Sequence, residues 1–136
     1  MRDFRKIDAW RLADDFAVAI YEATQSFPRE EIYRLTSQLR RAACSVPANI
    51  VEGASRGSKK DYLHFLYIAR GSCSEAHYFV HLSTRLAYLS EPVSVRLDAM
   101  ASQTGRTLAG LIRVVEKEIP MESCPQSTVP RPRSNP

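Results

Sequence analysis

Residues 35–53 read LTSQLRRAACSVPANIVEG and contain the pattern that decides the fold. Apolar and small side chains recur here at alternating steps of three and four, which is the spacing of a helix face packed against other helices. The positions on that face are Ile32, Leu35, Leu39, Ala42, Val46, Asn49 or Ile50, and Gly53. Because its later members are small, we expect a neighbouring helix to approach closely at that end.

Pro47 lies in the middle of this pattern. A proline inside a helix removes the N–H that would bond to the carbonyl of Ala43, at a cost of about 3 kcal/mol. The helical pattern nevertheless continues on both sides of it. We therefore predict a helix that begins at about Glu30, or is capped later by Thr36, and that is kinked at Pro47.

Three further stretches have the apolar period of a helix and are separated by short connections. Their expected bounds are Asp8 to Phe27, Ser58 to about Leu89, and Ser90 to Ile119, with Asp8, Ser58 and Ser90 as the N-caps. Four amphipathic helices with short connections favour an all-α, antiparallel up-down four-helix bundle over residues 1–119. Residues 120–136 contain five prolines, and we expect them to form a disordered tail that cannot build a core.

The third predicted helix carries two apolar faces. One is sufficient to face the bundle core, and the second would leave a large apolar patch on a monomer. We therefore expect homo-oligomerisation through this helix, although a single broad stripe buried within one bundle would explain the same pattern. The expected interface residues are Phe65, Ile68, Phe79, Leu82 and Leu86.

Composition favours a soluble cytoplasmic protein. The charged N-terminus leads into no apolar run, and no stretch approaches the roughly 18 apolar residues of a membrane span. The three cysteines are odd in number and form no CxxC pair, as expected for reduced thiols. Residues 29–60 hold 7 basic and 3 acidic side chains, so this segment alone carries a net charge equal to the +4 of the whole chain.

A localised positive charge favours an anionic partner. Arg34, Arg41 and Arg56 share a stripe of the second predicted helix with amide and hydroxyl side chains, a combination suited to phosphate contacts. A solvated helix face with local ion pairs would produce the same stripe. The residues predicted to bind nucleic acid are Arg34, Arg40, Arg41, Arg56, Lys59 and Lys60.

No pattern typical of an enzyme is present. Cys73, His77 and His81 follow one another at steps of four, but one straight helix cannot wrap three ligands around a metal ion. The sequence contains no HExxH motif, no phosphate-binding glycine loop and no nucleophile with a local catalytic signature. We therefore predict a non-enzymatic protein with no metal and no cofactor.

The runs LTSQLRRAA, at residues 35–43, and PANIVEG, at residues 47–53, resemble a known family. It comprises four-helix-bundle proteins encoded by intervening sequences in bacterial large-subunit rRNA genes, related to the accessory variability determinant proteins of diversity-generating retroelements. The resemblance implies a homo-oligomer, typically a pentamer with a basic surface. The retroelement relatives are adaptors that bind a reverse transcriptase and nucleic acid.

By this resemblance, Arg40 and Arg41 match the family's paired arginines. A second set of positions is expected to be structural or to lie in an interface: Pro47, Asn49, Glu52 and Gly53. The predicted function is an oligomeric adaptor that contacts RNA or DNA phosphates through the basic helix, with a reverse transcriptase as a further partner and no role at a membrane. The alternative is a protein-interaction scaffold with no nucleic-acid role.

Overall fold

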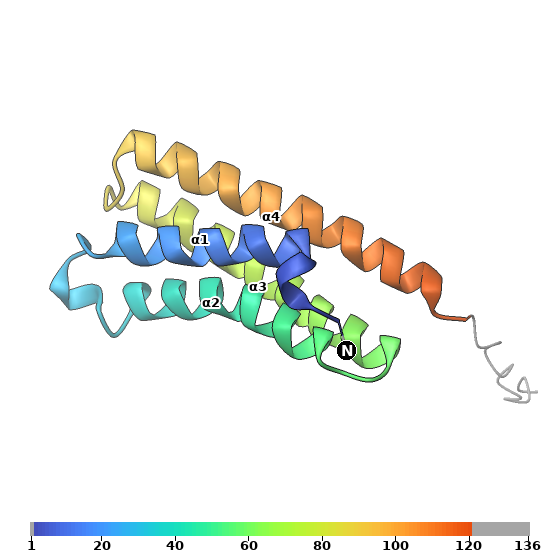
Figure 1. Ribbon diagram of the computed structural model, residues 1–136. Helices are drawn as coiled ribbons and strands as arrows, with labels where there is room; N and C mark the ends of the chain where they lie inside the picture. The colour runs from blue at the N-terminus through green and yellow to red at the C-terminus, as the bar shows by residue number, and fades with distance from the viewer. Residues whose placement is uncertain (1, 121–136) are drawn as a thin grey trace, which may run out of the picture.

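The computed structural model describes residues 2–120, and within this range the chain contains helices and no strand (Figure 1). The predicted tail, apart from Pro120, lies outside the described residues. Short 3-10 turns precede the first two long helices. The elements are η1 (Phe4–Lys6), α1 (Asp8–Thr24), η2 (Arg29–Glu31), α2 (Leu35–Ala54), α3 (Lys59–Arg85) and α4 (Glu91–Glu118).

The four long helices form an antiparallel up-down bundle, as the sequence predicted (Figure 1). Each helix packs against the helices before and after it in the chain, and α4 closes the ring by packing against α1. The most extensive interface is that between α2 and α3. The N-terminus lies beside the α2–α3 connection, where the backbone N–H of Arg2 donates to the carbonyl of Ala54 at 3.4 Å.

The core consists of two apolar clusters that follow each other along the bundle axis. Each fully buried large side chain contributes about 1.5–3 kcal/mol by leaving water. The buried hydroxyls of Thr24 and Thr104 are satisfied locally, since each donates to the carbonyl four residues earlier at 2.8 Å. The buried hydroxyl of Thr36 has no hydrogen-bond partner within residues 2–120. The largest buried side chains include Phe16, Ile20, Leu39, Val80 and Leu97 in one cluster and Val46, Ile50, Leu66, Leu108 and Ile112 in the other.

The predicted start of α2 was wrong. Residues 29–31 form a separate 3-10 turn, and α2 begins at Leu35, whose backbone N–H donates to Glu31 Oε2 at 3.2 Å. A carboxylate at a helix N-terminus satisfies a free N–H and interacts favourably with the helix dipole. Thr36, the alternative cap, is instead a buried residue inside the helix. Ile32 is consequently 51% exposed, although the sequence placed it on the core face.

Two other helix ends differ in detail from the prediction, and one agrees with it. Asp8 is the first residue of α1 instead of its cap, and Ile7 holds the cap position without a side-chain hydrogen bond. The side chain of Ser90 likewise makes no capping bond at the start of α4. The cap predicted for α3 is confirmed, because Ser58 Oγ accepts from the N–H of Asp61 at 3.1 Å.

Helix α3 ends at Arg85, four residues before the predicted end. Ala87 then adopts a left-handed conformation with φ of 60°. The N–H of Tyr88 donates to the carbonyl of Ser83, and the N–H of Ala87 to that of Thr84, both at 3.0 Å. This is the paired hydrogen-bond pattern with which glycine commonly ends helices, here formed around an alanine. Since no glycine is present, the sequence contains no stop signal at this point.

Gly53 allows α2 and α3 to approach closely, as the small residues of the pattern predicted. A Cβ atom at this position would lie 2.9 Å from the Cβ of Phe65 and 3.2 Å from the backbone carbonyl oxygen of Tyr62. Neither atom belongs to the free end of a flexible side chain, so the helices themselves would have to separate. Helix α2 runs from Leu35 to Ala54 without interruption through the buried Pro47, and the kink there stays a prediction.

Gly53→Ala should therefore destabilise the protein by about 1–2 kcal/mol. Overpacking typically costs 1–3 kcal/mol, and the better helix propensity of alanine offsets up to about 1 kcal/mol of this. Gly71→Ala is the matched control, because a Cβ at Gly71 would meet nothing within 4 Å. That variant should gain up to about 1 kcal/mol. Denaturant unfolding of both variants measures the two changes, and equal effects would contradict the close approach.

Ala87→Gly should stabilise the protein by about 0.5–1 kcal/mol, because a left-handed conformation costs an alanine about 1–2 kcal/mol that glycine largely avoids. Ala99→Gly, at an exposed position inside α4, should have the opposite sign and lose about 1 kcal/mol. Thermal unfolding distinguishes the two substitutions. A loss of stability in both variants would show that Ala87 is not strained in solution.

Candidate nucleic-acid interface

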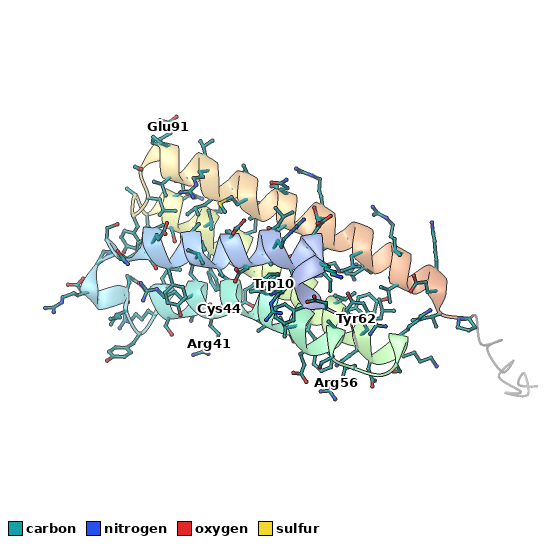
Figure 2. The ribbon with its side chains drawn as sticks, viewed as in Figure 1. Trp10, Arg41, Cys44, Arg56, Tyr62 and Glu91 are labelled. Atoms are coloured by element: carbon teal, nitrogen blue, oxygen red, sulfur yellow. The ribbon has the colours of Figure 1, made fainter. Side chains whose placement is uncertain are left out.

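Most of the predicted basic residues lie at the surface. Arg34, Arg41 and Arg56 are exposed, as are Lys59 and Lys60 at the start of α3. Figure 2 shows Arg41 and Arg56 projecting from the same edge of the bundle, away from α1 and α4. We refer to these five residues as the basic surface. It extends from Arg34, just before α2, through Arg41 on that helix to Arg56 in the α2–α3 connection and the two lysines in the first turn of α3.

Arg40 has a different environment, because its side chain is half-buried and holds α1 against α2. Its Nε donates to Thr24 Oγ1 at 2.8 Å, and its guanidinium lies 4.7 Å from the ring centroid of Tyr21. A charged hydrogen bond and a cation–π contact on one side chain contribute to the stability of the helix pair. We therefore assign Arg40 to packing and exclude it from the basic surface.

Arg56 and Lys59 of the basic surface are engaged in exposed ion pairs. Arg56 lies 2.6 Å from Glu52 and 4.9 Å from the ring of Phe65, and Lys59 lies 3.6 Å from Glu118. Exposed pairs of this kind contribute about 0–1 kcal/mol, so a phosphate can compete with them. Within residues 2–120, no side-chain hydrogen bond or ion pair engages the guanidinium of Arg34 or that of Arg41.

Arg41 borders a polar cleft of about 380 Å³ between α2 and α3. At this cleft, the hydroxyls of Ser45 and Ser72 are 2.9 Å apart, which joins the two helices by a hydrogen bond. Asn49 supports this bond, since its Nδ2 donates to the carbonyl and to the hydroxyl of Ser45 at 2.8 and 2.9 Å. The sequence assigned Ser72 to an apolar face and did not reveal this bridge. The cleft is lined by Gln38, Arg41, Ala42, Ser45, Ser72 and Glu75.

An exposed aromatic ring also lies close to Arg41, and sequence reasoning missed it. Tyr33 is 91% exposed and lines a shallow pocket together with Arg40 and Arg41. Tyr33 belongs to the turn of residues 32–34 that connects η2 to α2. Aromatic rings beside arginines are the usual platform on which proteins stack unpaired bases. The sequence contained a signal for this site, because Tyr33 lies inside the basic segment and directly precedes Arg34.

The comparisons with known proteins confirm the intervening-sequence part of the resemblance described above, and the relation to retroelement proteins stays a prediction. The family model of the 23S rRNA-intervening sequence protein matches residues 5–110. The chain belongs to this family. No curated protein matches the sequence.

One solved structure has a similar fold. It is the crystal structure of a protein of unknown function from the S23 ribosomal protein family of Bacteroides thetaiotaomicron VPI-5482. The TM-score is 0.71 and the sequence identity is 23%, over 77% of this chain and 95% of that chain. At this level of identity the likeness shows the fold alone.

The positions carried over from the family pattern have separate roles in this member. Gly53 allows the α2–α3 approach, Asn49 supports the serine bridge, and Glu52 pairs with Arg56. Pro47 lines a groove between α1 and α2. All four residues therefore take part in helix packing or local pairing within the bundle, and a role in an interface between chains stays a prediction.

The predicted oligomer interface on α3 is only partly exposed. Ile68 and Leu86 are 40% and 46% exposed, whereas Phe79 and Leu82 are half-buried and pack against the chain's own core. Phe65 is also half-buried, beside Gly53 and Arg56. The second apolar face of α3 thus contributes partly to the bundle itself. Self-association stays a prediction, now with a smaller exposed area on this helix.

The histidines and cysteine of α3 do not come together as ligands. Cys73 is buried and its Sγ lies 3.7 Å from the carbonyl oxygen of Ala101, and burial raises the pKa of its thiol. His77 Nε2 lies 2.7 Å from Asp98 Oδ1, which joins α3 to α4. Among residues 2–120, no three His, Cys, Asp or Glu side chains are placed to hold a metal ion.

No helix within residues 2–120 is long and apolar enough to cross a membrane.

The different environments of Arg40 and Arg41 can be tested by stability. Arg40→Ala should lower the free energy of unfolding by about 1–2 kcal/mol, because it removes a charged hydrogen bond and a cation–π contact. Arg41→Ala should change it by less than about 0.5 kcal/mol, as is usual for exposed positions without partners. Chemical denaturation measures both values. Equal losses in the two variants would contradict the assignment of Arg40 to packing.

Proposed function

We propose that this protein is a non-enzymatic, oligomeric adaptor that binds nucleic acid through phosphate contacts made by the basic surface. The observation that supports this best is the pair of exposed guanidiniums, Arg34 and Arg41, that no side chain of residues 2–120 engages. Since residues 29–60 carry a net charge of +4, these groups lie in a segment of positive potential.

The lining of the cleft suits a phosphate oxygen. Arg41 offers several N–H donors in one plane, and the side chains of Gln38 and Ser72 add an amide and a hydroxyl beside it. Glu75 on the α3 side of the same cleft repels anions and would restrict a phosphate to the half nearer Arg41. Arg41 is therefore expected to contact one phosphate at the edge of the cleft, and Arg34, which does not line the cleft, is expected to contact another.

Tyr33 supports a single-stranded ligand. A duplex keeps its bases stacked inside, whereas an unpaired base can stack on an exposed ring. None of these groups is arranged to recognise the edges of a particular base, so we expect binding with little sequence preference. Structured RNA with an unpaired loop would combine both features, and single-stranded RNA is the simplest probe.

Oligomerisation would multiply these weak contacts. Repeating the basic surface around a symmetry axis raises the local positive potential and the number of simultaneous phosphate contacts. Five copies are implied by the family resemblance, as is a reverse transcriptase as the protein partner. The alternative function, a protein-interaction scaffold, is supported by the exposed apolar side chains of Ile68 and Leu86 on α3.

Arg34→Ala combined with Arg41→Ala should weaken binding to single-stranded RNA at least tenfold at low salt. It should also reduce the slope of log K against log salt by about 1.4, or about 0.7 for each lost phosphate contact. Fluorescence anisotropy across a salt series gives both quantities. Light-scattering mass of the same samples checks that the assembly is unchanged.

The matched control is Arg96→Ala with Arg113→Ala, which removes the same charge from exposed positions of α4, diagonally across the bundle from α2. It should leave the affinity within about twofold and the slope nearly unchanged. Equal weakening by the two double variants would indicate a response to net charge alone. Absence of any RNA or DNA binding by the native protein at low salt would favour the scaffold.

A further inference from the structure

A groove of about 580 Å³ runs between α1 and α2, apart from the polar cleft on the α2–α3 side. Its apolar lining comes from Trp10, Val18 and Tyr21 on α1 and from Pro47 and Val51 on α2. Val18 and Tyr21 are 52% and 46% exposed, so the groove presents an aromatic and aliphatic surface to water. Figure 2 shows the labelled Trp10 and Cys44 between the ribbons of α1 and α2.

The charged residues that line this groove are both acidic. Asp14 and Glu22 are exposed positions on α1, two turns apart, and none of the other lining residues is a lysine or an arginine. An apolar groove with aromatic walls and an acidic edge fits a ligand that combines proline or aliphatic side chains with positive charge.

The chain itself contains a segment with this composition. Residues 121–136 read MESCPQSTVPRPRSNP, in which Arg131 and Arg133 alternate with Pro130 and Pro132. Proline-rich segments bind aromatic-lined grooves because their conformational freedom is already restricted, so little entropy is lost on binding. The two arginines supply positive charge at a spacing of two residues, opposite in sign to the acidic edge of the groove.

Helix α4 ends at the same end of the bundle as the start of α1, and Glu118 in its last turn lies 3.6 Å from Lys59 on α3. Val115 near the end of α4 belongs to the same apolar cluster as Ala9, and Trp10 packs against that cluster. Sixteen residues at about 3.1 Å each span about 50 Å, whereas the 17 residues of α1 are about 26 Å long. A tethered ligand of this length acts at an effective concentration in the millimolar range.

We propose that residues 121–136 bind as an intramolecular ligand in the α1–α2 groove. The prolines contact Trp10 and Tyr21, and Arg131 and Arg133 lie beside Asp14 and Glu22. Binding of this segment covers the groove and excludes other proline- and arginine-containing segments from it. This inference does not depend on nucleic-acid binding, because the groove shares no residue with the basic surface or the polar cleft and shares only Tyr21 with the pocket beside Tyr33.

The protein's single tryptophan reports directly on the groove, because Trp10 is one of its walls. In the full-length chain, Arg131→Glu with Arg133→Glu should release the segment, shift the Trp10 emission to longer wavelength and increase acrylamide quenching about twofold. Arg96→Glu with Arg113→Glu, on α4, is the control for net charge and should leave both readouts unchanged. Equal changes in the two variants, or no change in either, would overturn the proposal.

Charge exchange provides the decisive comparison. Adding Asp14→Arg and Glu22→Arg to the Arg131→Glu, Arg133→Glu variant restores opposite charges on the groove and the segment. Acrylamide quenching of Trp10 should then return to the level of the native protein. Circular dichroism checks that each variant retains its helices. Quenching that stays at the level of the Arg131→Glu, Arg133→Glu variant would overturn the proposed pairing of the two arginines with the two acidic residues.

A disulfide trap tests the location independently, because Cys44 already lines the groove. In a Cys124→Ser background, Ser127→Cys should form an intrachain disulfide with Cys44 under mild oxidation. The control moves the groove thiol to an exposed position of α3, with Cys44→Ser and Ser74→Cys, and should cross-link much more slowly. Equal rates at the two sites, or a disulfide mainly between two chains, would overturn an intramolecular ligand.

Discussion

The close approach of α2 and α3 at Gly53 is the constraint on which the remaining structure depends. A Cβ there would lie 2.9 Å from that of Phe65, so the two helices are in contact at a point where one has no side chain. Farther along the same interface, the hydroxyls of Ser45 and Ser72 meet at 2.9 Å and Asn49 supports them. These contacts join the two helices that form the polar cleft, and Arg41 lies at the edge of this cleft.

The paired arginines show how adjacent residues of one helix acquire different roles. Successive side chains on a helix diverge by about 100°, so Arg40 points toward α1 whereas Arg41 points away from it. Arg40 bonds to Thr24 at 2.8 Å and stacks on Tyr21, which fixes the angle between the first two helices. The guanidinium of Arg41 stays exposed at the surface. Packing in this bundle thus determines which of the basic residues are available to a ligand.

Much of the fold could be predicted from periodicity, because a helix that buries one face repeats its apolar residues every three or four positions. The failures have local causes. Helix α3 ends through an alanine in a left-handed conformation, where the usual glycine is missing, and α2 is capped by the carboxylate of Glu31, four residues before the bonded N–H. Ile32 fits the apolar pattern of α2 but precedes the helix, and it is therefore exposed.

The candidate site was less predictable, because it depends on contacts between helices. The basic segment is visible in the sequence, but the engagement of Arg40 requires Tyr21 and Thr24 from another helix. Ser72 also reads as a polar interruption of an apolar face until α2 brings Ser45 against it. The groove between α1 and α2 follows from the arrangement of two helices, each of which is unremarkable when considered alone.

Ultraviolet cross-linking of the native protein to single-stranded RNA, followed by mass spectrometry of the attached peptides, tests the central claim most directly. We predict that the cross-links concentrate between residues 32 and 45, with Tyr33 as the principal site, because its exposed ring adjoins Arg41. Cross-links confined to α4, or spread evenly over the exposed aromatic residues, would contradict the placement of the nucleic-acid interface on α2.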